Sequence, residues 1–133
     1  MGTGIDGAPC VSRDHRKLDV FRDSDGLVED IYRATKDFPA SERFGLQTQI
    51  RRSCVSTATN IVEGAARRGE REFVNFLNIA AASAAESRYL IALSARLGFV
   101  APDQAEQFEN RFRKLCAQLE SLIRSLRGPA PEA

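Results

Sequence analysis

The sequence predicts an all-α protein, an up-down-up-down four-helix bundle, from three observations. Apolar residues recur at three- and four-residue spacing in four long segments, which is the periodicity of a helix with a buried face. Short connections containing Gly or Pro separate these segments. No stretch shows the alternation of apolar and polar residues that is typical of a strand.

The length limits the chain to one domain. With 133 residues, it can bury a single core and is too short for two domains of ordinary size. We expect the bundle to span residues 15–127. Residues 1–14 and 128–133 are rich in Gly, Pro and small side chains without apolar periodicity, so we expect both to be flexible tails.

Residues 18–36 are predicted to form the first helix. One side of it carries five residues at helical spacing, and Val20, Leu27 and Ala34 widen that stripe; the five are Leu18, Phe21, Val28, Ile31 and Thr35. Gly26 interrupts the pattern and should weaken the helix by about 1 kcal/mol relative to Ala, with room for a bend. Pro39 should end the helix near Asp37, because the residue before a proline avoids helical geometry.

The second helix is predicted to begin soon after Pro39. Its core stripe consists of Leu46, Ile50, Cys54, Thr57, Ile61 and Gly64. A neighbouring stripe is also apolar or small, which predicts burial on more than one side; it comprises Val55, Ala58 and Val62. The remaining side is a polar line that could simply be solvated: Arg52, Ser56, Asn60, Glu63 and Arg67. Within this line, the spacing predicts an ion pair between Glu63 and Arg67.

A Gly-rich turn over residues 64–69 should lead into a third helix that ends before Gly98. Glu70 and Glu72 suit the positive N-terminal end of that helix. The helix has a wide apolar arc, formed by Phe73, Phe76, Leu77, Ile79, Ala80, Ala84, Leu90, Ile91, Leu93 and Leu97. This arc is more than three partner helices in a small bundle require, so the excess predicts a subunit interface.

Glu86 stands within this apolar arc. An unpaired buried carboxylate is costly, so we expect Glu86 to meet a cation or hydrogen-bond donors. Arg51 and Arg52 on the antiparallel second helix are the candidate partners. A structural or interfacial ion pair is the first interpretation, and a ligand-contacting or catalytic acid is the alternative.

The fourth helix is predicted to start with Asp103 as its N-cap and Glu106 three residues later, a variant of the capping box. Its stripe keeps a near-heptad spacing: Phe108, Phe112, Leu115, Leu119, Leu122 and Leu126. Cys116 and Ile123 thicken the stripe. We expect this helix to pack on one side only.

Composition and motifs argue against several function classes. The net charge of +1 gives no strong attraction to nucleic acid or membrane, so polyanion binding would need a local patch. Cys10, Cys54 and Cys116 form no C-x-x-C pair and His15 has no partner histidine, so we expect no metal and no cofactor. The sequence lacks a nucleophile with a base, so we expect no catalytic residues and no enzyme. No apolar run could span a membrane, and we expect a cytoplasmic protein.

Three short motifs occur in order along the second helix: Phe-Gly-Leu at 44–46, Arg-Arg at 51–52 and Asn-Ile-x-Glu-Gly at 60–64. Together with LDVFRDSDGLVEDIYRATKDFP in the first helix and FLNIAAASAAE in the third, they carry a family resemblance. Residues 18–125 resemble a bacterial family of four-helix-bundle proteins encoded in intervening sequences of large-subunit ribosomal RNA genes.

The resemblance implies a four-helix bundle that assembles as a homopentamer and has no established catalytic residues. Relatives include accessory proteins of diversity-generating retroelements, which bind nucleic acid and a reverse transcriptase. The recurrent polar positions of the family fall here on Arg51, Arg52, Asn60, Glu63, Arg67 and Glu86. The chain differs in having Ala58 where many members have proline, and in its near-neutral charge, because the retroelement relatives are strongly basic.

Two functions of different classes remain open. The first is an oligomeric binding module for structured RNA, DNA or a nucleic-acid-processing partner, in which Arg67, Arg68 and Arg71 contact phosphates. Arg51 or Arg52 would add to these contacts, and a ring of subunits would repeat them as a basic rim. The second is a protein-interaction scaffold without a nucleic-acid role, in which the arginines are solvated or pair with Glu63, Glu70 and Glu72. No stacking platform is evident, since Trp is absent and most Phe residues lie on core stripes.

Overall fold

Four long helices make up most of residues 13–128, the part of the chain that this computed structural model describes. They are α1 (Asp19–Ala34), α2 (Leu46–Ala65), α3 (Glu70–Arg96) and α4 (Pro102–Arg127). The short 3-10 turn η1 (His15–Lys17) precedes α1, and a second, η2 (Ala40–Glu42), lies between α1 and α2. No strand occurs in this range. The predicted all-α fold with four helices is confirmed. Most of the two predicted tails, namely residues 1–12 and 129–133, lies outside the described residues.

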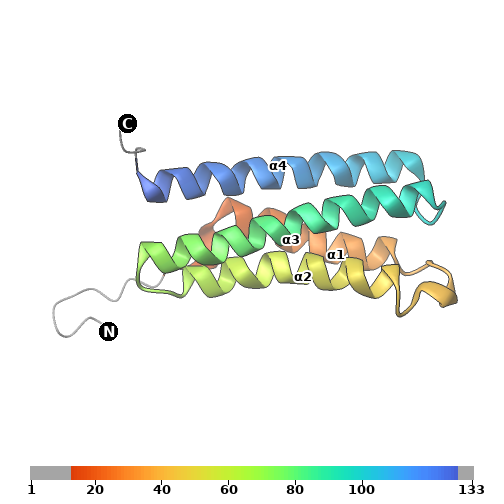
Figure 1. The fold of residues 1–133 in the computed structure, drawn as a ribbon, viewed down its shortest axis with the longest axis horizontal. Coiled ribbons are helices and arrows are strands. Elements are labelled where there is room, and N and C mark those ends of the chain that lie inside the picture. The colour runs from red at the N-terminus through yellow and green to blue at the C-terminus, as the bar shows by residue number, and fades with distance from the viewer. Residues whose placement is uncertain (1–12, 129–133) are drawn as a thin grey trace.

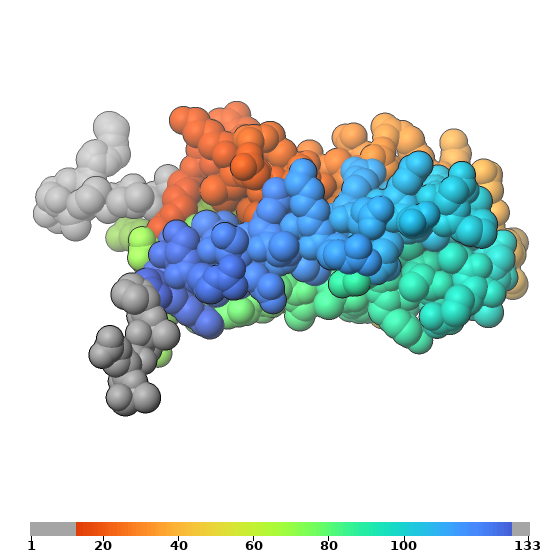
Figure 2. Space-filling view, turned by 90° about the horizontal axis from the view of Figure 1, so that it is seen from above, coloured from red at the N-terminus to blue at the C-terminus, as the bar shows by residue number. Residues whose placement is uncertain are grey.

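Consecutive helices run in opposite directions and pack as a ring of four (Figure 1). The contact between α2 and α3 is the most extensive, followed by that between α3 and α4, and α1 closes the ring against α4. Figure 2 shows α4 along the length of the molecule, with α1 on one side and α3 on the other. The end of α4 therefore lies at the same end of the bundle as the α2–α3 turn (Figure 1).

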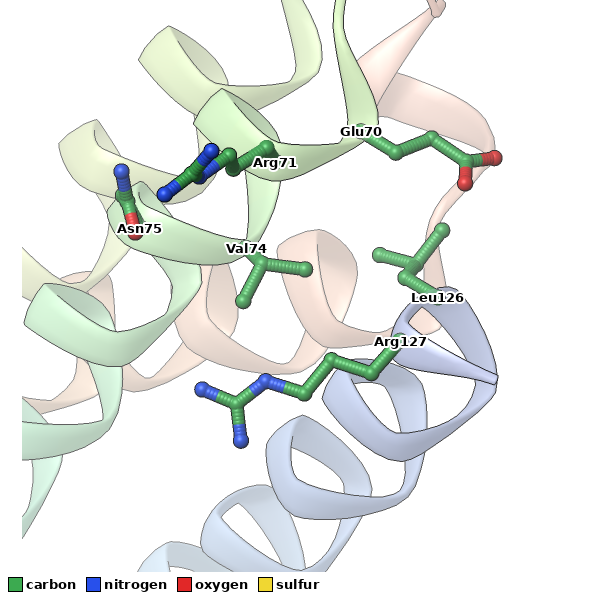
Figure 3. A pocket seen from close by; sticks show the side chains of 6 residues that line it. All are labelled: Glu70, Arg71, Val74, Asn75, Leu126 and Arg127. Carbon is green, nitrogen blue, oxygen red and sulfur yellow. The ribbon is translucent and has the colours of Figure 1, made fainter. Parts of the chain in front are cut away.

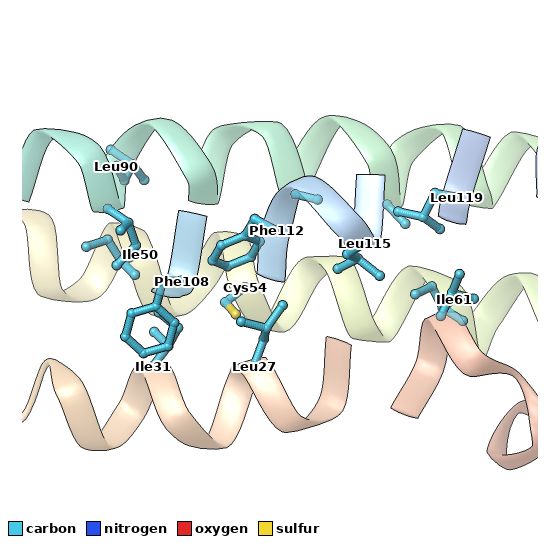
Figure 4. Packing of buried hydrophobic residues seen from close by; sticks show 14 of the residues in the cluster. Leu27, Ile31, Ile50, Cys54, Ile61, Leu90, Phe108, Phe112, Leu115 and Leu119 are labelled. Carbon is cyan, nitrogen blue, oxygen red and sulfur yellow. The ribbon is translucent and has the colours of Figure 1, made fainter. Parts of the chain in front are cut away.

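Side chains from all four helices fill the centre (Figure 4). The predicted core stripe of α2 is confirmed. Leu46 is partly buried, and the other five residues are buried: Ile50, Cys54, Thr57, Ile61 and Gly64. In α4 the predicted stripe is correct as far as Leu119, after which Ile123 is buried and the predicted Leu122 and Leu126 are only partly buried. A seven-residue repeat drifts around a straight helix of 3.6 residues per turn, so the buried position changes toward its end.

The buried stripe of α1 is offset from the predicted one. The buried positions are Val20, Ser24, Leu27 and Ile31, whereas three predicted central residues are only partly buried: Leu18, Phe21 and Val28. Ser24 is tolerated in the core because its hydroxyl donates to the Phe21 carbonyl at 3.0 Å. The helix continues through Gly26 without interruption.

The connection between α1 and α2 is longer than predicted. Phe38 turns back into the core and packs against Phe99, with ring centroids 5.5 Å apart. The chain then forms η2 and reaches α2 only at Leu46, whose backbone N–H donates to the Glu42 carboxylate at 3.0 Å. Glu42 thus satisfies one of the free N–H groups at the start of α2.

Small residues bring α2 and α3 together. The Ser53 and Ser87 hydroxyls lie 2.7 Å apart in the core, and those of Ser56 and Ser83 lie 2.8 Å apart nearer the surface. At Gly64, an added Cβ atom would stand only 2.8 Å from the Cβ atom of Phe76. The predicted hairpin of these two helices therefore forms with close backbone contact.

The turn from α3 to α4 confirms one predicted terminus and corrects another. Gly98 has a φ of +83°, the left-handed conformation expected after the end of α3. The predicted N-cap at Asp103 is wrong, because α4 begins at Pro102 with Ala101 as its N-cap and without a side-chain cap. Proline suits the first position of a helix, since its fixed φ is helical and its missing N–H would have no partner there.

Candidate nucleic-acid interface

The five arginines predicted to contact phosphate fall into two separate groups. Arg51 and Arg52 lie in the first half of α2, whereas Arg67 and Arg68 lie in the α2–α3 turn and Arg71 follows on α3. Arg51 is 14 residues before Ala65, the last residue of α2, so the helical rise places it about 21 Å from the start of the turn that holds Arg67. Within one chain, they do not form a single site.

Arg51 is engaged within the bundle. Its Nε donates to the Thr35 hydroxyl at 2.9 Å and its Nη2 donates to the Tyr32 carbonyl at 3.1 Å. The guanidinium also lies over the Tyr32 ring, 4.4 Å from its centroid. These contacts fasten the end of α1 to α2, so Arg51 has a structural role that the sequence did not indicate. Arg52 is exposed and makes no such contact among the described residues.

The arginines of the α2–α3 turn are exposed and have no acidic partner. Arg67 lies over Phe76, with 4.8 Å between its Cζ and the ring centroid, and the predicted ion pair with Glu63 does not form. Arg68 and Arg71 are likewise exposed. Within residues 13–128, no ion pair joins these three arginines to Glu63, Glu70 or Glu72. Of the two arrangements that the scaffold hypothesis allowed, pairing is therefore absent here and exposure to solvent is present.

The charges on α1 and α4 are arranged differently. Arg22 pairs with Asp19, Arg33 with Asp30 at 3.0 Å and Arg88 with Glu109 at 2.7 Å. Further pairs link α4 to α1: Arg111 with Asp30 and Lys114 with Asp23. Several positive charges on this side are therefore paired locally, whereas Arg67, Arg68 and Arg71 form no ion pair within the described residues.

Two further arginines, which the sequence analysis did not select, lie at the same end. Arg13 is held there by its backbone N–H, which donates to the Ala65 carbonyl at 2.9 Å, and by its Cζ, 4.5 Å from the Phe73 ring centroid. Arg127, in the last turn of α4, lines a groove of about 430 Å³ together with the start of α3 (Figure 3). The antiparallel order of the helices could have indicated this neighbourhood, since it brings the end of α4 beside the start of α3.

Glu86 meets a hydrogen-bond donor, as expected, but within the single chain it is not buried and does not pair with Arg51 or Arg52. Glu86 is exposed and accepts a hydrogen bond from Gln49 Nε2 at 3.1 Å, while the neighbouring Ser87 occupies the buried position. Ser87 can be buried because its hydroxyl donates to the Ser83 carbonyl at 3.0 Å and also meets Ser53. The polar residue in the apolar arc is thus a serine, one position away on the helix.

The predicted polar line of α2 lies on the outer surface of the hairpin. Asn60 Nδ2 donates to the Ser56 carbonyl at 2.8 Å, and Glu63 is exposed. A shallow groove of about 460 Å³ follows this line and is lined by Tyr32, Arg51, Arg52, Val55, Ser56, Thr59, Asn60 and Glu63. The structure therefore places Asn60, Glu63, Arg51 and Arg52 along one groove. Glu86 does not line this groove, and its link to α2 is the hydrogen bond from Gln49.

The described residues offer little for covalent or metal chemistry. They contain no cluster of three or more His, Cys, Asp or Glu side chains that could hold a metal ion. Burial raises the pKa of the Cys54 thiol to about 12, which disfavours the reactive thiolate. His15 packs edge-on against Phe21, 4.7 Å between ring centroids. None of the helices in the described range is long and apolar enough to cross a membrane.

Comparisons with known proteins agree with the helical fold. The family model described as 23S rRNA-intervening sequence protein matches residues 16–121. The structure is similar to that of a protein of unknown function from the S23 ribosomal protein family of Bacteroides thetaiotaomicron, with a TM-score of 0.71 and 28% identity. That similarity covers 79% of this chain and 98% of the other. A search of functionally curated proteins found no match.

Proposed function

The chain belongs to the 23S rRNA-intervening sequence protein family, and we propose that it is a non-enzymatic, homo-oligomeric protein of the cytoplasm that binds the phosphate backbone of structured RNA or DNA. Arg67, Arg68 and Arg71 make the principal contacts, and Arg52 contributes from a neighbouring position in the assembly. The family resemblance on the 44–46, 51–52 and 60–64 motifs supports a homopentamer as the assembly.

One observation carries the nucleic-acid part of the proposal: Arg67 and Arg68 in the α2–α3 turn and Arg71 at the start of α3 have no acidic partner among the described residues. Phosphate contacts of this kind release counterions, so they bind without sequence preference and weaken as salt rises. A rim of repeated turns would present many such contacts, although the net charge of a single chain is only +1.

The oligomeric part of the proposal draws on apolar side chains left exposed on α2 and α3. Val55 is 37% exposed and Ile79 is 48% exposed, and both lie in the middle of long helices. A contiguous exposed apolar patch is typical of a surface that a partner covers, whereas single exposed apolar side chains are common. We infer that Val55 and Ile79 belong to one such patch. Head-to-tail contact between copies of this surface would close into a ring.

The first experiment is sizing chromatography at low salt with light scattering and absorbance recorded at two wavelengths, 260 and 280 nm. The protein contains two Tyr and no Trp, so it absorbs weakly and a small amount of carried nucleic acid raises the ratio visibly. A pentamer mass together with bound nucleic acid supports the proposal. A pentamer free of nucleic acid favours the alternative, a protein-interaction scaffold, and a monomer contradicts both.

A matched pair of triple variants then tests the arginines. R67Q/R68Q/R71Q removes three unpaired cations, whereas R16Q/R22Q/R33Q removes three that pair with Asp14, Asp19 and Asp30. Both variants change the net charge equally, so nonspecific attraction would weaken equally in both. We expect the first variant to lose RNA affinity at least tenfold more than the second, measured by fluorescence anisotropy at two salt concentrations.

A further inference from the structure

The groove between the start of α3 and the end of α4 combines two guanidinium groups with an apolar floor. Val74 and Leu126 form the floor, and the polar side chains around it are Glu70, Arg71, Asn75 and Arg127. In Figure 3, the guanidinium groups of Arg71 and Arg127 and the amide of Asn75 lie on one side of Val74. The Glu70 carboxylate points away at the opposite end of the groove.

The charges in this groove favour an anion. Glu70 is already partnered, since its Oε2 lies 3.9 Å from Arg13 Nη2. Arg71 and Arg127 are exposed, and neither forms an ion pair within the described range of the chain. The N-terminal end of α3 adds positive potential, because its N-cap, Gly69, has no side chain to satisfy the first N–H groups. The last carbonyls of α4 contribute negative potential, and the Arg127 side chain runs back along α4 on the groove side, away from the end of the helix (Figure 3).

We propose that this Arg71–Arg127 groove holds a phosphate of a nucleic-acid strand, with one guanidinium on each side of the phosphate. This inference rests on the function proposed above and adds α4 to the nucleic-acid surface. The groove is open to solvent and much larger than a single phosphate ion, so it accommodates a strand that runs through it better than a free ion. From the groove the strand continues to Arg67 and Arg68 in the adjacent turn.

The test uses the full chain, with Arg127→Gln as the variant and Arg113→Gln as its control. Both arginines are exposed on α4, but Arg113 pairs with Glu109 at 3.4 Å and lies outside the groove. Binding to a fluorescein-labelled RNA hairpin and to a DNA duplex of equal length is measured by anisotropy over a range of salt concentrations. We expect R127Q to weaken binding at least threefold and to lower the slope of log affinity against log salt by about 1. R113Q should change neither quantity.

The outcomes separate this inference from the proposed function. If the wild-type protein binds RNA and R67Q/R68Q weakens the complex while R127Q does not, the groove is excluded and the proposed function stands. If the wild-type protein binds neither probe, the proposed function fails, and the groove assignment fails with it. Inorganic phosphate at constant ionic strength serves as the third probe. Stabilisation of the wild-type protein by phosphate alone, without RNA or DNA binding, would overturn the assignment to a nucleic-acid strand.

Discussion

Gly64 occupies a position in α2 where a larger side chain has no room. An added Cβ atom would stand 2.8 Å from Phe76 Cβ and 2.9 Å from Phe73 Cδ1, closer than such atoms normally approach. We therefore expect Gly64→Ala to lower the free energy of unfolding by about 1–3 kcal/mol, although Ala has the higher helix propensity. Chemical denaturation followed by circular dichroism, at a fixed protein concentration, measures the change.

Gly26 provides the control, because it too lies inside a long helix. The nearest neighbour of an added Cβ atom there is Arg111 Nη2 at 3.5 Å, an ordinary contact with a flexible side chain. Gly26→Ala should therefore raise the free energy of unfolding by about 0.5–1 kcal/mol. Similar losses for both substitutions would contradict the steric explanation for Gly64.

The sequence could identify most polar residues on the helices but not their neighbours. Glu86 stood out because it interrupts an apolar pattern, yet Glu86 is exposed and the neighbouring Ser87 is buried. A serine can enter a core by donating to the carbonyl four residues earlier, which periodicity does not reveal. Likewise, nothing in the sequence distinguishes Arg51 from Arg52, and only the position of Tyr32 and Thr35 in space separates their roles.

At the scale of whole helices, the Arg51 contacts give a second prediction. Arg51 ties α2 to the last turn of α1 through Thr35 and Tyr32, and it stacks on the Tyr32 ring. Arg51→Gln removes these contacts and leaves the Tyr32 carbonyl without this donor. We expect a loss of about 1–2 kcal/mol in the free energy of unfolding, measured by urea denaturation.

Arg52→Gln is the matched control, since it removes the same charge from the adjacent position. Arg52 is exposed and makes no equivalent contact in the described chain, so its replacement should change stability by less than about 0.5 kcal/mol. If Arg52→Gln destabilised the protein as much as Arg51→Gln, the loss would come from general electrostatics rather than from the junction of α1 and α2.

Helices with long apolar periodicity and a glycine at their ends could be predicted from the sequence, whereas the irregular connections could not. The end of α3 follows from Gly98, and the α2–α3 hairpin follows from the glycines of its turn together with two long apolar segments. By contrast, η2 and the late start of α2 depend on Phe38 packing against Phe99, a contact between residues distant in sequence. The Arg71–Arg127 groove was missed for the same reason, since its two sides come from the start of α3 and the end of α4.

Over the whole molecule, net charge is a poor guide to binding. The net charge of +1 is a sum over two regions with different charge arrangements, the α1–α4 side and the end of the bundle at the α2–α3 turn. Several cations on α1 and α4 form ion pairs with nearby acids, whereas Arg67, Arg68, Arg71 and Arg127, at one end of the bundle, form none among the described residues. Charges of the two regions that lie farther apart than the Debye length, about 8 Å at physiological salt, do not cancel one another effectively. Near the turn, Glu63, Glu70 and Glu72 reduce the local positive charge, and Arg13 and Arg127 at the same end of the bundle add to it. A nearly neutral chain can therefore present a basic surface to a polyanion.

Replacing the exposed Ile79 tests whether the protein forms the oligomer that would repeat the basic surface. Ile79 lies in the middle of α3 and is 48% exposed in the single chain. If a second copy covers it, Ile79→Glu places a charge in a desolvated contact, which costs several kcal/mol for each interface. We expect light scattering at micromolar concentration to show a shift toward the monomer mass of 14.7 kDa.

Leu97, 53% exposed beyond the end of α3, is the control, and Leu97→Glu should leave the assembly intact. Dissociation by Leu97→Glu alone would move the interface to the end of the bundle.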